Sequence, residues 1–213
     1  MANTAIEIAY SGIRKSIFDG DFPPGFHLRE EELAETFEVS RTPVREAMRR
    51  LVEEGLVEIR ENRRSYVSDV SPQELEDIFD VLSMLESYSV SLAAKRITDE
   101  QLEELKGLQD QLESCGEEDE SFIRLNSQFH KALHRISGSK RLYDIIVQLV
   151  NFPSTCYLKV GVHTENDTAN QQHRNIIDAL ERRDADWAAL QMKMHTETVR
   201  QEYRQLLNAK TGE

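Results

Sequence analysis

Four polar side chains in the second half of the chain have types and a spacing that suit metal binding. Asn126 and His130 are four residues apart and share one face of a helix, while His173 and His195 lie on two further predicted helices. Three packed helices can direct these groups into a bundle interior. Imidazole nitrogens suit Zn, Ni, Fe, Mn or Co, and three histidines leave coordination positions open for water or a ligand. Taken singly, each histidine fits better as an ordinary hydrogen-bonded helix residue.

A second group of side chains suits DNA binding. Residues 41–64 hold seven arginines and five glutamates, a net charge of +2 in a chain of net charge −13, so the remainder carries −15. DNA affinity depends largely on neutralising phosphates, so this local reversal marks the expected contact surface. Ser40, Arg41, Thr42 and Arg45 crowd the first turns of a predicted helix, where arginine can bond guanine and hydroxyls can reach phosphates. Alone, the segment also fits a capped helix with a solvated basic face.

The elements around these arginines predict a winged helix-turn-helix over residues 1–70. Apolar spacing indicates helices at 5–19 and 30–37, and a third that begins after Ser40 as its N-cap. Two short strands, 56–60 and 65–68, flank a polar hairpin tip. Three helices and a β-hairpin make this fold. Its second and third helices form the helix-turn-helix, and the third is the recognition helix that enters the major groove.

The rest of the chain, residues 71–213, is expected to form an antiparallel bundle of about six helices, so the fold class is mainly α. Ser71 is an N-cap and Glu74 completes a capping box. A charged fraction of 31% with 7% aromatic residues fits a helical protein. The helices are expected at residues 72–96, 98–114, 118–137, 139–160, 166–183 and 184–208.

Composition favours a cytoplasmic protein without membrane contact. No apolar run reaches the roughly 20 residues that cross a bilayer, and the first residues lack the basic and apolar regions of a signal peptide. Cys115 and Cys156 lie far apart without metal-ligand spacing, which suits a reducing compartment.

Residues 33–57 resemble the GntR family of transcription regulators, whose signature is close to "LA…F.VSRTPVREA…L..EGLV". The resemblance implies a DNA-contacting helix and a wing that enters the neighbouring minor groove. Two positions depart from the pattern. Glu38 replaces a glycine of the turn between the helices, at a cost of about 1 kcal/mol if its φ is positive, and a serine replaces a frequent wing glycine. The DNA-binding residues expected are Ser40, Arg41, Thr42, Arg45, Arg49, Arg63, Arg64 and Ser65.

Residues 72–208 resemble the FCD domain of the FadR-type branch of that family. This resemblance implies that Asn126, His130, His173 and His195 bind a divalent metal and that His134 is structural. Asparagine stands where the family has aspartate, which removes a negative charge and should weaken metal binding. The residues that carry the resemblance are Leu85, Glu86, Leu92–Ala94, Phe129–Leu133, Ser137, Gly138, His173–Ala179, Asp184, Ala185 and His195.

The effector implied by the resemblance is a small molecule, with organic acids as the candidate chemical class. Leu82 replaces an arginine with which carboxylate-sensing members often bind their ligand, so that bidentate contact is missing. The remaining candidates for the cavity can equally well be interpreted as polar residues on the surface. The candidates for the cavity lining are Ser83, Tyr88, Arg124, Tyr157 and Asn175.

Together these features predict a homodimeric regulator, a repressor more readily than an activator, which binds an inverted repeat in double-stranded DNA and responds to an effector. One alternative is the same regulator with a metal-free ligand cavity. Another is a dimerisation module without a ligand. A hydrolase using His130, His173 and His195 around a metal is disfavoured, because the chain has no paired acid motif such as HExxH. We therefore expect no enzyme.

Overall fold

The computed structural model describes residues 4–69, 71–115, 120–160 and 166–211. The chain separates into two compact units, the first formed by residues 1–75 with 148–161 and the second by residues 76–147 with 162–213. The predicted domain boundary falls at Val70, which lies outside the described residues.

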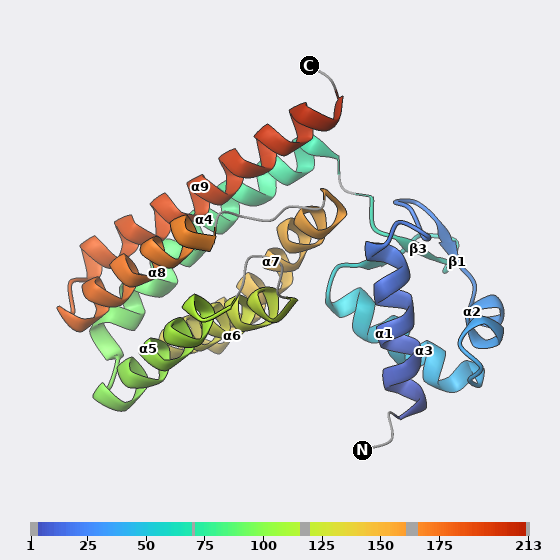
Figure 1. The fold of residues 1–213 in the computed structure, drawn as a ribbon, viewed down its shortest axis with the longest axis horizontal. Helices are drawn as coiled ribbons and strands as arrows, with labels where there is room; N and C mark the ends of the chain where they lie inside the picture. Colours follow the sequence, from blue (N-terminus) through green and yellow to red (C-terminus); the bar gives the residue numbers. More distant parts are fainter. Residues whose placement is uncertain (1–3, 70, 116–119, 161–165, 212–213) are drawn as a thin grey trace. The chain divides into compact units, whose positions relative to one another are not determined.

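Three helices form most of the first unit: α1 (Ala5–Phe18), α2 (Glu30–Thr36) and α3 (Arg41–Glu53) (Figure 1). α1 packs against both α2 and α3. Their shared core includes Ile13, Val44 and Leu51, all fully buried. Gly12 allows α1 to approach Phe37, because a Cβ atom there would lie 2.4 Å from the phenyl ring.

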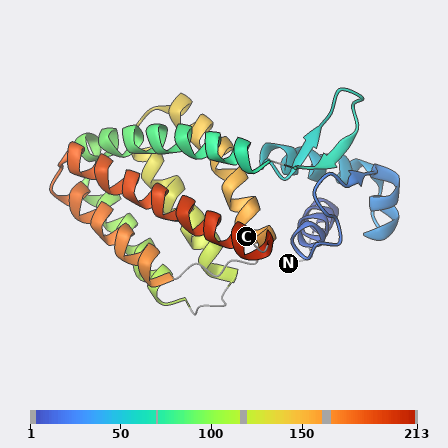
Figure 2. The same cartoon turned by 90° about the horizontal axis from the view of Figure 1, so that it is seen from above.

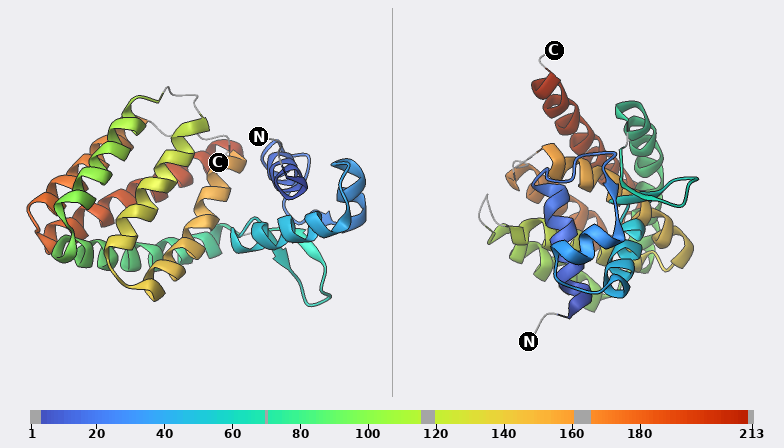
Figure 3. Two further views of the ribbon diagram at one scale, coloured as in Figure 1. Left: turned by 90° about the horizontal axis from the view of Figure 1, so that it is seen from below. Right: turned by 90° about the vertical axis from the view of Figure 1, so that its right-hand side faces the viewer.

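A small antiparallel sheet completes this unit. Its strands are β1 (His27–Leu28), β2 (Val57–Ile59) and β3 (Ser65–Val67), in the order β1-β3-β2. The hairpin between β2 and β3 protrudes from the helices (Figure 3). The predicted winged helix-turn-helix is therefore confirmed, with one addition: β1 pairs with β3, placing His27 opposite Tyr66.

Six long helices make up the rest of the described chain, as the mainly α prediction requires. They are α4 (Pro72–Arg96), α5 (Asp99–Glu113), α6 (Glu120–Ile136), α7 (Lys140–Val160), α8 (Asn166–Glu181) and α9 (Ala185–Thr211). α4 and α9 run antiparallel side by side (Figures 1 and 2). Arg200 and Arg204 of α9 bond to Glu76 of α4 at this junction. α5 contacts α6 and α8, and α8 contacts α9.

The second unit has its own apolar core and well-formed helix ends. Phe129, Ile176 and Met192 are fully buried at its centre. Thr98 begins α5 with a capping box. The expected cap of α4 also forms, since Ser71 and Glu74 bond to each other's backbone nitrogens. Among the described residues, no helix is long and apolar enough to span a membrane.

Candidate metal centre and DNA-binding surface

Three histidines from three helices meet inside the second unit. His130 lies on α6, His173 on α8 and His195 on α9. Their ring centroids are 5.1 Å apart for His130 and His173, 5.1 Å for His130 and His195, and 4.9 Å for His173 and His195. One nitrogen from each ring lies within 4.8 Å of the other two. This spacing allows three imidazoles to bind one ion with small side-chain movements.

Two unsatisfied polar atoms belong to this cluster, and a third lies one helical turn before His130 on α6. Asn126 Oδ1, His130 Nδ1 and His173 Nε2 are buried and have no hydrogen-bond partner among the described residues. An unpaired buried polar group costs about 1–3 kcal/mol, so these three atoms require an explanation. All three atoms can donate a lone pair to a cation. The donor set therefore fits a divalent metal ion of the kind predicted from the sequence.

The far sides of two histidine rings are held by glutamines. His173 Nδ1 lies 3.0 Å from Gln109 Oε1, and His195 Nδ1 lies 2.8 Å from Gln172 Oε1. Histidines that bind metals usually have such a partner on the second nitrogen, which orients the ring. Neither glutamine was identified from the sequence.

Burial keeps these imidazoles neutral. The pKa of His130 is lowered to about 3, mainly by burial and then by the neighbouring His195, and burial lowers the pKa of His195 to about 4. Burial and the two neighbouring rings also lower the pKa of His173 well below its usual value. Metal ligation requires the neutral form of imidazole, so the cluster is ready to bind metal at neutral pH.

His134 and Glu86 form a buried pair that adjoins the cluster, since each offers a ligand atom within 4.8 Å of one from His130. His134 contacts Ser89 Oγ through Nδ1 at 3.1 Å and Glu86 Oε1 through Nε2 at 3.3 Å, which agrees with its predicted structural role. Thr196 donates a hydrogen bond to Glu86 Oε2. Burial raises the pKa of Glu86, but the hydrogen bond with His134 and the nearby histidines outweigh this effect and lower it. The sequence did contain a signal for Glu86, because it continues the apolar stripe of Leu82.

The residues expected to line an effector cavity range from exposed to half-buried where their side chains are described. Tyr88 is 59% exposed, and Arg124 also lies at the surface. Ser83 and Asn175 are half-buried, and Asn175 accepts a hydrogen bond from a neighbouring glutamine on α8. The side chain of Tyr157 lies outside the described residues. Their role in effector binding stays a prediction.

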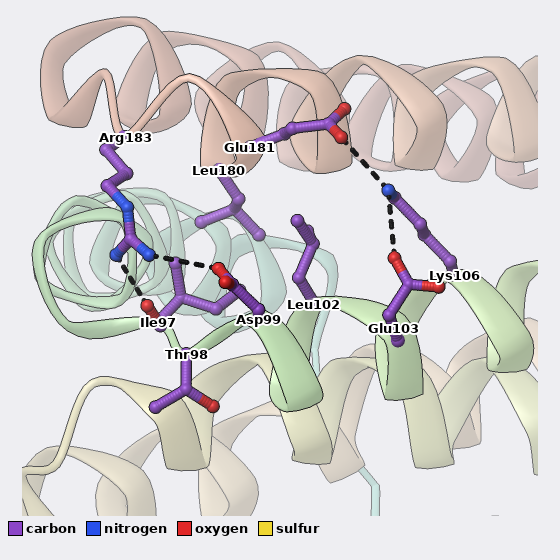
Figure 4. Close-up of a pocket in the computed structure, with 9 residues that line it drawn as sticks. All are labelled: Ile97, Thr98, Asp99, Leu102, Glu103, Lys106, Leu180, Glu181 and Arg183. Carbon is purple, nitrogen blue, oxygen red and sulfur yellow. Dashed lines mark hydrogen bonds and ion pairs between the residues drawn. The ribbon is translucent and has the colours of Figure 1, made fainter.

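A groove elsewhere in the unit lies between α5 and the end of α8 (Figure 4). Its charged groups bond to one another: Lys106 bonds to Glu103 and Glu181, while Arg183 bonds to Asp99 and to the carbonyl of Ile97. None of the histidines lines this groove. Since these charges already have partners, the groove offers fewer groups for a ligand than the histidine cluster does.

The predicted recognition helix is α3, and its N-terminal residues face solvent. Ser40 precedes the helix in an extended conformation and forms no side-chain cap bond. Arg41, Thr42, Arg45 and Arg49 are all exposed. The helix can therefore offer a hydroxyl pair and three guanidinium groups to a groove of DNA.

Acidic side chains hold two of these arginines. Arg45 forms two hydrogen bonds with Glu30, at 3.0 and 2.8 Å, and Arg41 bonds to Glu30 at 3.3 Å and to Glu31 at 2.8 Å. The bonds from Arg45 lower the pKa of Glu30. Arg49 is paired with Glu46 on its own helix. Any phosphate or base that binds Arg41 or Arg45 must compete with Glu30.

Two left-handed residues shape the neighbouring turns. Glu38 has a φ of 53°, as the glycine at this position of the family pattern predicts, and Arg63 at the wing tip has a φ of 58°. Arg63 and Arg64 are exposed, whereas Ser65 is half-buried as the first residue of β3. Positive φ in a residue other than glycine indicates a conformation imposed by the surrounding fold.

Comparison with known proteins identifies both units. The model for bacterial regulatory proteins of the gntR family matches residues 6–67, and the FCD domain model matches residues 77–198. The chain belongs to the GntR family. It is a DNA-binding transcription regulator of this family with a C-terminal FCD domain. Members of the family are transcription regulators rather than enzymes.

Relatives in the GntR family share most of the chain. It is 30% identical over 200 residues to the HTH-type transcriptional repressor RspR of Escherichia coli, covering 92% of this chain and 88% of RspR. The repressor NanR of Cronobacter sakazakii is 32% identical over 193 residues, covering 80% of this chain and 74% of NanR. The solved structure of E. coli McbR/YncC has the same fold, with a TM-score of 0.75 at 23% identity over 96% of this chain and 99% of that one.

Proposed function

We propose that this GntR-family regulator is a homodimeric repressor whose affinity for its operator is controlled by a small molecule bound to a metal ion in the FCD domain. The operator is an inverted repeat, with α3 of each subunit in one half-site and the wing beside it. Two relatives that carry the word repressor in their names, RspR and NanR, support this sign of control.

One observation carries the metal site: Asn126 Oδ1, His130 Nδ1 and His173 Nε2 are buried and have no partner among the described residues, and His130, His173 and His195 offer ligand atoms within 4.8 Å of one another. Asn126, His130, His173 and His195 would hold the ion. A metal with four protein ligands of this kind keeps positions open, at which an effector can bind directly. The effector class that suits such positions is a small chelating anion, for example an organic acid.

The ligand set has no negative charge, because Asn126 replaces a carboxylate and the imidazoles are neutral. Even with the Glu86 carboxylate beside His130 counted against it, a divalent ion in this site would keep a net positive charge, which favours an anionic effector over a neutral one. Effector and operator binding are then reciprocally linked through the two conformations that they select.

The deciding experiment is metal analysis by mass spectrometry on protein purified without a histidine tag or chelator. We expect about one equivalent of transition metal per chain in the wild-type protein and none in His173→Ala. His27→Ala is the matched control, since His27 lies on β1 outside the cluster, and it should keep the metal. Absence of metal from the wild-type protein, also after incubation with Zn, Ni, Fe, Mn or Co, would leave the regulator with a metal-free cavity.

A further inference from the structure

We propose that Gln109 and Gln172 are positioning residues of the metal site, each of which fixes the tautomer of one ligand histidine. Gln109 acts on His173 and Gln172 acts on His195. This inference rests on the proposed metal-binding function. The observation behind it is that hydrogen bonds to other side chains orient both amides with their oxygen toward a histidine, and this sets the tautomer of each imidazole.

The orientation of Gln109 is set by two acceptors. Its Nε2 lies 3.0 Å from Asn170 Oδ1 and 2.9 Å from Glu113 Oε1. Glu113 is itself fixed by two hydrogen bonds from Arg174. A carboxylate only accepts hydrogen bonds, so the NH2 group of Gln109 must face it and Oε1 must face His173. Gln109 is 1% exposed, and water does not compete for these bonds.

The orientation of Gln172 is set by a hydroxyl group. Thr198 donates its proton to the backbone oxygen of Met194 at 3.0 Å, and in this arrangement Thr198 Oγ1 accepts from Gln172 Nε2, which lies 2.7 Å away. The amide oxygen of Gln172 is therefore the atom that faces His195.

These two orientations determine where the imidazoles carry their protons. A neutral imidazole has one N–H group and one lone pair, and an amide oxygen accepts but does not donate. His173 and His195 must then carry the proton on Nδ1 and the lone pair on Nε2. The Nε2 of His173 is one of the buried, unpartnered atoms of the cluster. Both rings are thus prepared for metal before the ion arrives, and no proton has to be displaced.

The test compares Gln172→Leu with Gln172→Glu. Leucine removes the acceptor, and we expect a mixture of His195 tautomers and zinc affinity about 10–100-fold weaker. Glutamate keeps an acceptor toward Nδ1, and the Thr198 hydroxyl can turn to donate to it. Gln172→Glu should therefore show the wild-type tautomer and at least the wild-type affinity. Gln109→Leu should affect His173 in the same way.

Two readouts are needed. Zinc affinity is measured by competition with a chromophoric chelator, and tautomers are assigned in the metal-free protein from the imidazole 15N shifts in long-range 1H–15N spectra. Gln171→Leu is the control, because Gln171 lies on the same helix, is exposed, and bonds only outside the cluster. It should change neither readout.

Wild-type zinc affinity and an unmixed Nδ1–H tautomer in both leucine variants would overturn the proposal. Equal loss of affinity in Gln172→Leu and Gln172→Glu would also overturn it, because that pattern indicates packing rather than hydrogen bonding. If the wild-type protein binds no zinc, the proposed metal function fails, and the tautomers of the metal-free protein still decide the role of the two glutamines.

Discussion

Acid should destabilise the metal-free FCD domain, and the pKa values of the histidine cluster give the size of this loss of stability. In the unfolded chain a histidine has a pKa of about 6.5. In the folded protein the pKa is lowered to about 3 for His130 and about 4 for His195, and that of His173 is lowered as well. The folded state therefore stays unprotonated where the unfolded state takes up protons. The stability that this provides is complete above pH 6.5 and is lost as the pH falls below it.

The size follows from linkage. At pH 5.5, a histidine that is protonated only after unfolding lowers the free energy of unfolding by about 1.4 kcal/mol relative to neutral pH. His130 and His195 together lower the free energy of unfolding by about 3 kcal/mol between pH 7.5 and 5.5, and His173, whose pKa is also lowered, adds to this loss. Carboxylates contribute little in this range, because the buried or paired groups Glu76, Glu86 and Glu113 have lowered pKa values.

Urea unfolding of chelator-treated protein measures this change. Trp187 is the single tryptophan and lies on α9, so its fluorescence reports on the unit that holds the cluster. His195→Gln should reduce the pH-dependent loss of unfolding free energy by about 1 kcal/mol, while His27→Ala should leave this loss unchanged. All variants are compared at the same protein concentration. A wild-type loss below about 1 kcal/mol, or an undiminished loss in His195→Gln, would refute the reasoning.

Three further predictions concern the winged helix-turn-helix. Arg45→Ala should weaken binding to an operator selected by the wild-type protein by about 1–3 kcal/mol, measured by fluorescence anisotropy, whereas Arg182→Ala, in the turn after α8, should not; equal affinities would remove Arg45 from the interface. Glu38→Gly should raise the stability of the first unit by up to about 1 kcal/mol in thermal unfolding, because it relieves the positive φ, and a decrease would contradict this. Gly12→Ala should destabilise it by about 1–3 kcal/mol through the clash with Phe37, and Phe37→Leu added to Gly12→Ala should recover part of the loss; no recovery would place the cost elsewhere.

Much of the fold could be predicted because its signals are local. Ser71 and Glu74 cap the start of α4, and Thr98 caps the start of α5, each through a partner within four residues along the chain. The helices fall close to their expected bounds. β1 was missed for the opposite reason. A strand of two residues has no alternating pattern, and His27–Leu28 becomes a strand only through its pairing with β3, almost forty residues away.

The residues of the candidate metal site also fall into those that the sequence could predict and those that it could not. The histidines were recognisable by residue type and by the family pattern, but Gln109 and Gln172 were not, since a glutamine on an amphipathic helix is usually a surface residue. Only the packing of α5 against α8, and of α8 against α9, gives them their partners. Tyr88 illustrates the converse: its side chain faces outward because the helix buries the positions of Glu86 and Ser89 instead.

The pairing of Arg41 and Arg45 with Glu30 affects how DNA binding responds to salt. Association with DNA is driven by the release of condensed counterions, with a logarithmic slope of about −0.9 per neutralised phosphate. An arginine that leaves Glu30 for a phosphate releases a cation from the DNA, but the carboxylate left behind then attracts a cation from solution. Fewer ions are released in total. The operator affinity of this regulator should therefore fall less steeply with ionic strength than the number of its arginine–phosphate contacts indicates.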